Sequence, residues 1–97
     1  MSSPTPFATP PEPDGAATVT ACYAVRARAE PGIMPRVLEL FAKRGLVPHH
    51  WRSTASPEAL AIEVQIAGLD RGMADYIGRA MRQIAGVESV LMSEISR

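Results

Sequence analysis

The chain has 97 residues, which is enough for one small domain and too few for two. Basic and acidic residues balance, so the formal net charge is +0. This balance excludes a strongly basic surface for binding nucleic acid or a membrane. A single cysteine, Cys22, excludes an internal disulfide and a cysteine-based zinc site, and we interpret it as a small apolar filler in a strand. Without a membrane-length apolar run or a signal peptide, we expect a cytoplasmic protein.

Residues 1–17 differ in composition from the rest of the chain. Prolines interrupt any regular backbone pairing here, and the small residues between them bury little apolar surface. We therefore expect a disordered, proline-rich tail over 1–17, followed by a single domain over 18–97.

Residues 18–28 alternate strictly, which predicts a strand with one buried face formed by Val19, Ala21, Tyr23, Val25 and Ala27. Pro31-Gly32 predicts a turn. A helix is expected to follow from about Met34 or Pro35 and to end at Gly45. The apolar residues of this segment recur at helical spacing and define its buried side: Ile33, Val37, Leu40 and Phe41.

The second half of the chain predicts two more strands, a helix and a last strand. Residues 46–54 are the weaker strand, and Pro48 favours an edge position for it, whereas residues 58–67 alternate cleanly. Asp70 is expected to cap a helix that ends at Gly86. The apolar side of this helix is formed by Met73, Ile77, Ala80, Met81 and Ile84. The last strand is expected over 87–95, with Val87, Leu91 and Ile95 facing inward.

This order of elements, βαββαβ, predicts an α+β, ferredoxin-like sandwich. Right-handed crossovers would place both helices on one face of a four-stranded antiparallel sheet, with the strands in the order four, one, three, two.

The second face of such a sheet would carry mostly small and apolar residues. The expected members are Thr20, Cys22, Ala24, Arg26 and Arg28, then Ala59, Ala61, Glu63, Gln65 and Ala67, and finally Val90, Met92 and Glu94. Two interpretations remain: the surface simply tolerates scattered apolar residues, or another chain covers it. We favour the second for a domain this small.

The sequence offers little that could perform chemistry. His49 and His50 would point to opposite faces of a strand and so cannot jointly hold a metal ion, and Trp51 suits packing or an interface. No phosphate loop or nucleophile motif is present, so no catalytic residue, metal or cofactor is expected. The outward positions of the central strands hold no aromatic residue, which argues against RNA binding. A small enzyme would have only His49, His50 and Arg52 to work with.

The segment from Ala29 to Gly45, with its Pro-Gly-Ile-x-x-Arg-Val start and Leu-Phe-Ala-Lys-Arg-Gly end, resembles the ACT domain. The resemblance is strongest to the short regulatory subunits of acetolactate synthase. It implies a non-catalytic protein that activates the acetolactate synthase catalytic subunit in branched-chain amino-acid biosynthesis. The alternative that it implies is a free-standing ACT domain that binds an amino acid or another small metabolite as a homodimer.

In ACT domains that bind amino acids, the loop after the first strand commonly reads Asn or Asp, any residue, Pro, Gly. The resemblance therefore implies that the ligand-binding residues are Ala29, Glu30, Pro31, Gly32 and Ile33. Pro31 and Gly32 match the motif, but Ala29 stands where the polar side chain would hold the effector. Weak or absent binding of valine and its relatives is the expected consequence.

Overall fold

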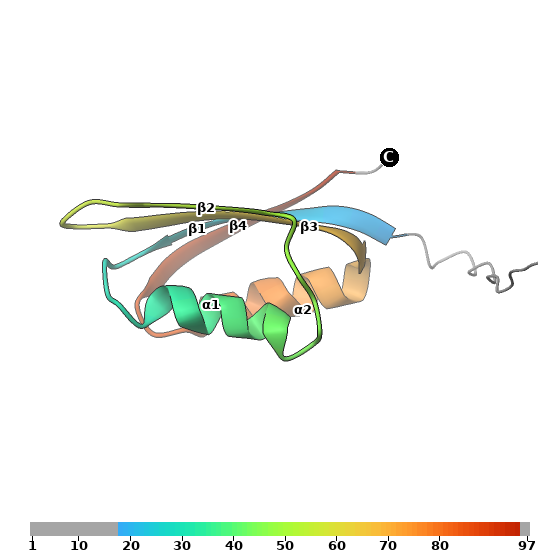
Figure 1. Cartoon of the computed structure of the whole chain (residues 1–97), viewed down its shortest axis with the longest axis horizontal. Coiled ribbons are helices and arrows are strands. Elements are labelled where there is room, and N and C mark those ends of the chain that lie inside the picture. The colour runs from blue at the N-terminus through green and yellow to red at the C-terminus, as the bar shows by residue number, and fades with distance from the viewer. Residues whose placement is uncertain (1–17, 96–97) are drawn as a thin grey trace, which may run out of the picture.

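A computed structural model describes residues 18–95 of the chain, so the expected tail over 1–17 lies outside the described residues. Two helices pack beneath one face of a four-stranded sheet (Figure 1). In chain order, the elements are β1 Thr18–Ala27, α1 Ile33–Ala42, β2 His50–Ala55, β3 Leu60–Asp70, α2 Arg71–Arg82 and β4 Val87–Ile95. The strands lie in the order β2-β3-β1-β4, and every neighbouring pair is antiparallel. The predicted ferredoxin-like sandwich is confirmed.

The element boundaries follow local backbone chemistry. The second strand was expected from Leu46 but begins at His50, after Pro48, which has no N–H to donate to the sheet. The third strand extends past the expected end to Asp70 through an irregularity at Ala67 and Gly68, where β3 has one residue more than β1. Gly68 adopts φ +73°, a left-handed conformation that suits glycine at such a bulge.

The core lies between the sheet and the helices. From β1 and β3 the inward residues are those that the alternation predicted, and Val64 and Ala21 are completely buried. The helices contribute the buried side chains of Ile33, Val37, Phe41, Ala74, Ile77 and Met81. Four predicted helix residues are only half-buried: Leu40, Met73, Ala80 and Ile84. Of these, Leu40, Met73 and Ile84 pack at the margin of the core.

The expected inward face of β4 is wrong beyond Val87. Ala27 pairs with Val87 and Arg26 with Ser89, so Glu88 is an extra residue, and this bulge reverses the alternation of the strand. Val90 is consequently 4% exposed and Met92 packs against the core, although both were expected on the outer face. Leu91 and Ile95, which were expected to point inward, are 71% and 47% exposed.

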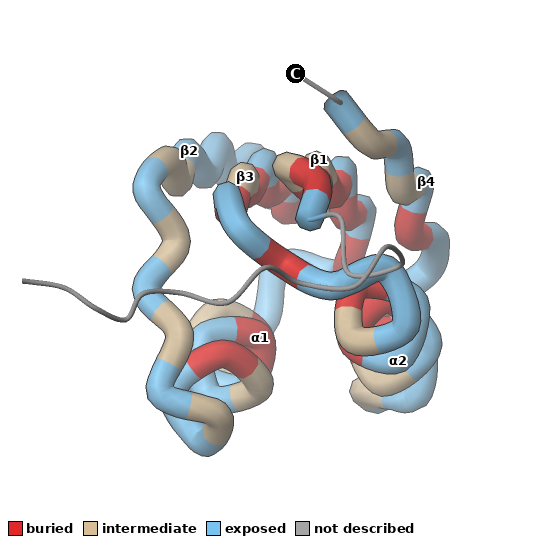
Figure 2. Tube along the Cα trace, turned by 90° about the vertical axis from the view of Figure 1, so that its right-hand side faces the viewer, coloured by how far each residue is buried: buried red, intermediate tan, exposed pale blue. Residues whose placement is uncertain are grey.

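The sheet surface opposite the helices, here called the open face, follows from the strand registers. Three rows of neighbouring residues cross it from β2 to β4: Arg52, Glu63, Ala24, Leu91; then Thr54, Ala61, Arg26, Ser89; then His50, Gln65, Cys22, Ser93. Figure 2 shows the buried positions concentrated on the central strands above the helices, whereas β2 carries none. Trp51, on the inner side of β2, packs at the edge of the core.

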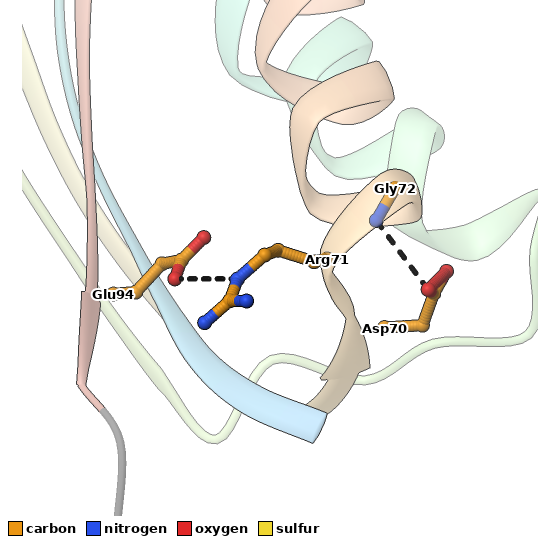
Figure 3. A network of polar contacts seen from close by, with 4 residues as sticks. All are labelled: Asp70, Arg71, Gly72 and Glu94. Carbon is orange, nitrogen blue, oxygen red and sulfur yellow. Dashed lines mark hydrogen bonds and ion pairs between the residues drawn. The ribbon is translucent and has the colours of Figure 1, made fainter. Parts of the chain in front are cut away.

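The start of α2 is fixed by two polar contacts at neighbouring residues (Figure 3). As predicted, Asp70 caps the helix: its carboxylate accepts from the backbone N–H of Gly72 at 3.4 Å and of Met73 at 3.1 Å. Arg71 donates from Nε to Oε1 of Glu94 at 3.0 Å, which ties the helix to β4.

Tyr23 joins the middle of the sheet to α2. Its side chain is 1% exposed, and its hydroxyl donates to the carbonyl oxygen of Ala74 at 2.6 Å. Burial, with smaller contributions from the charges of Asp75 and Glu94, raises the pKa of Tyr23 to about 12. This residue therefore belongs to the core, where it holds the two layers in register. Neither helix has the length and apolar character needed to cross a membrane.

Candidate functional site

The loop between β1 and α1 forms a tight turn at one end of the sandwich. The N–H of Ile33 donates to the carbonyl of Glu30 at 3.2 Å, which closes a four-residue turn with Pro31 and Gly32 at its centre. Gly32 has φ −83° and ψ −7°, the values of the third residue in a type I turn, and proline suits the second position. The predicted turn is therefore present and leads directly into the helix.

The five residues that the resemblance implicates have different environments. Ala29, Glu30 and Pro31 are exposed, and Gly32 is half-buried. The side chain of Ile33 is completely buried in the core, and its N–H is already used within the turn. A molecule bound at this turn would therefore contact residues 29–32, whereas Ile33 would anchor the turn in the core.

Gly86, the residue immediately before β4, lies directly beside this turn. Its carbonyl accepts from the N–H of Arg28 at 2.9 Å. A Cβ atom built on Gly86 would lie 2.8 Å from Cδ1 of Ile33 and 3.1 Å from Oε1 of Glu30. The sequence identified Gly86 only as the end of the preceding helix, because spacing along the chain carries no sign of a contact with residues more than fifty positions earlier. A glycine here lets the turn pack against β4.

The turn combines donors for an anion with a nearby carboxylate. No side chain caps α1 and no acidic residue lies in its first turn. Within residues 18–95, no backbone carbonyl accepts a hydrogen bond from the N–H of Gly32 or of Met34. Pro35 has no backbone N–H. The guanidinium of Arg36 lies over Gly32, with Nη1 3.4 Å from where a Cβ would stand. Glu30, whose Oε2 lies 3.6 Å from Nε of Arg28, supplies negative charge within the same turn.

The histidines lie away from this turn. His50 is on the open face, with Nε2 3.8 Å from Oε1 of Glu63, and Arg52 approaches the same oxygen at 3.8 Å. His49 is exposed just before the strand. Across the part of the chain that the structure describes, no three His, Cys, Asp or Glu side chains gather closely enough to hold a metal ion.

The comparison with protein families places most of the chain in one of them. The family model described as an ACT-like domain matches residues 14–97. Among curated proteins, no sequence relative matches the chain.

Solved structures share the fold at low sequence identity. The chain is similar to the ACT domain from GTP pyrophosphokinase of Chlorobium tepidum, at 12% identity and a TM-score of 0.70 over 79% of this chain and 100% of that one. It is also similar to the C-terminal domain of the MgtC protein from Mycobacterium tuberculosis, at 11% identity and a TM-score of 0.64 over 86% and 92%. A homoserine dehydrogenase from Thiobacillus denitrificans matches at 14% identity and a TM-score of 0.67, over 92% of this chain but 20% of the dehydrogenase. These likenesses show the fold.

Proposed function

This chain belongs to the ACT-like domain family, and we propose that it is a non-catalytic regulatory protein that binds a small α-amino acid at the turn before α1. ACT domains are in general regulatory modules, which agrees with the absence of a catalytic motif in the sequence. The ligand-contacting residues in this proposal are Ala29, Glu30, Pro31 and Gly32, with Ile33 fixing the turn in the core.

The observation that carries the proposal is the charge arrangement at the turn. Two backbone N–H groups at the start of α1, together with the guanidinium of Arg36, suit a carboxylate. The carboxylate of Glu30 suits an ammonium group. An α-amino acid carries both groups on one carbon, so a small zwitterion matches the positive and the negative groups of this turn.

The side chain missing at Ala29 limits the affinity. A hydrogen bond to a charged group contributes about 1.5–3 kcal/mol, which corresponds to roughly tenfold to over a hundredfold in the dissociation constant. Ala29 is exposed beside the turn, so Ala29→Asn adds a polar group there without disturbing the core. We expect calorimetry with valine, leucine and isoleucine to show weak binding to the unmodified chain and tighter binding to Ala29→Asn. Tight binding to both proteins alike would show that this position does not decide affinity.

Arg36→Gln tests the carboxylate contact directly. Removing the guanidinium should weaken amino-acid binding by roughly tenfold or more, because a charged donor is lost. Arg79→Gln is the matched control, since Arg79 is an exposed arginine on the other helix, outside the segment that forms the turn. Equal affinities of the two variants would contradict an amino-acid site at the turn.

The proposed partner is the catalytic subunit of acetolactate synthase. The support for it is the sequence likeness of residues 29–45 to the short regulatory subunits of that enzyme. Co-expression with the catalytic subunit, followed by affinity purification and an activity assay with and without this chain, tests the proposal. We expect a stable complex with raised activity. An unchanged activity and no co-purification would reject this partner.

A free-standing amino-acid-binding homodimer is the second candidate. The exposed Leu91 on the open face favours it, because a second copy can cover that residue. Binding of an amino acid by a dimer that ignores the catalytic subunit would select this candidate over the first.

A further inference from the structure

The open face carries exposed apolar side chains at one margin. The bulge at Glu88 turns Leu91 and Ile95 outward, and Leu91 remains 71% exposed. Its neighbour on β1 is Ala24, whose small side chain leaves Leu91 standing above the sheet. Leu91, Ala24 and Ala61 together form a small apolar patch on this surface, and exposed apolar patches often mark contact sites.

A hollow lies directly beside Leu91 on the same face. It measures about 370 Å³, and Ala24 and Ala61 are among the small residues that line it. Arg26, Arg52 and Glu63 also border it. In a two-fold symmetric dimer, the same surface patch of each copy faces that of the other. A side chain that projects from one copy can therefore enter the hollow of its partner, and the reverse contact forms at the same time.

The charges of the open face can also pair with those of a second copy. Within residues 18–95, Arg26 has no carboxylate within ion-pair distance. Among the described residues, the ion-pair contacts of Glu63 are the two of 3.8 Å to His50 and Arg52, which leave its oxygens able to accept a closer donor. A second copy can bring its Glu63 to Arg26 and its Arg26 to Glu63.

We propose that the open face binds the open face of a second copy of this chain, with Leu91 of each copy in the hollow of the other. The strand edges are less suited to pairing. β2 has six residues and follows Pro48, whereas β4 carries the bulge at Glu88. Short strands, prolines and bulges all disfavour edge-to-edge association.

The area of the face sets the expected strength. Four strands about 4.8 Å apart and about seven residues long give a flat area of roughly 450 Å² per copy, or roughly 900 Å² for both. Stable interfaces bury about 1,200–2,000 Å² in total, and weaker ones bury less. A dimer that forms at about ten to several hundred micromolar is therefore expected.

Sedimentation of the full chain from about 5 to 500 µM measures this association. Leu91→Asp should raise the dissociation constant roughly tenfold to a hundredfold, because the buried leucine is lost. Leu38→Asp is the matched control, since Leu38 is 43% exposed on α1 and lies on the other layer. A chain that stays monomeric throughout this range would overturn the proposal, as would a dimer that Leu38→Asp dissociates and Leu91→Asp does not.

Mixing two charge variants tests the pairing of Arg26 with Glu63. Arg26→Glu and Glu63→Arg should each self-associate weakly, because like charges then face each other across both contacts. An equimolar mixture should associate at least tenfold more tightly than either alone, since both ion pairs are restored in the heterodimer. A mixture that associates no better than its components would reject this arrangement.

Cys22 reports on the same surface without any substitution. It is the chain's single cysteine and lies half-exposed on the open face. Its labelling by a maleimide should slow as the protein concentration rises through the dimerisation range, and Leu91→Asp should abolish that slowing. Labelling at one rate throughout the dimerisation range would contradict a covered open face. None of these measurements uses the amino-acid site, so this proposal and the proposed function can fail separately.

Discussion

Replacing Gly86 with alanine tests how the candidate site is held against the sheet. Gly86 combines a left-handed backbone, φ +96°, with a close approach to the turn before α1. An added methyl carbon would lie 2.8 Å from Cδ1 of Ile33, well inside van der Waals contact, and Ile33 is completely buried. The neighbouring core therefore has to shift before alanine can be accommodated.

Two contributions set the size of the effect. A left-handed conformation costs a residue other than glycine about 1–2 kcal/mol. Overpacking a filled core adds about 1–3 kcal/mol. Gly86→Ala should thus lower the free energy of unfolding by about 2–5 kcal/mol, a large share of the roughly 5–15 kcal/mol that stabilises a domain of this size.

Chemical denaturation of the full chain measures this difference against two internal controls. Gly45 and Gly68 have φ +68° and φ +73°, but an added Cβ would meet nothing within 4 Å at either position. Gly45→Ala and Gly68→Ala should therefore show the backbone contribution alone, about 1–2 kcal/mol. Ile33→Val removes Cδ1, so it should cost less in the Gly86→Ala background than in the unmodified chain. Equal losses at all three glycines, or strict additivity with Ile33→Val, would refute the packing argument.

Three further predictions concern the core, a helix cap and the turn. Tyr23→Phe should lower the free energy of unfolding by about 1–3 kcal/mol at pH 7, because the carbonyl of Ala74 loses a buried donor. Since burial raises the pKa of Tyr23 to about 12, above the value near 10 of the unfolded chain, its contribution should be complete below pH 10 and lost between pH 10 and 12. Urea unfolding across that range should show a smaller alkaline loss for Tyr23→Phe, and an identical loss would contradict the assignment. Asp70→Ala should lower the free energy of unfolding by about 0.5–2 kcal/mol, as measured by thermal unfolding. Asp70→Ser should retain most of that stability, because serine also caps helices. Equal losses of stability in the two variants would argue against the cap. Gly32→Val should leave the unfolding midpoint nearly unchanged, because φ −83° suits any residue and only the flexible Arg36 side chain is near. The same substitution should impair the binding of a ligand or partner. Unaffected binding would remove the turn from the functional site.

The sequence alone determined the order of the elements, the strand order and the buried side of α1. For α2 it identified Ile77 and Met81 on the buried side but missed Ala74 and Gly78. Alternation in β1 and β3 and helical spacing in α1 and α2 depend only on local geometry, which repeats along the chain. The cap at Asp70 and the turn at Pro31-Gly32 are equally local, because the side-chain or backbone groups involved lie within three residues of each other. Such features can be found without knowledge of the tertiary structure.

Only the tertiary structure decided which way the residues of β4 face and what surrounds the turn. The alternation of β4 reverses at Glu88, because one strand carries a residue that its neighbour does not, and the register between two strands is a property of the pair. The contact of Gly86 with Ile33 and the position of Leu91 beside the hollow likewise join segments far apart in sequence. Local periodicity holds no information about such contacts, since they are fixed when the sheet assembles over the helices.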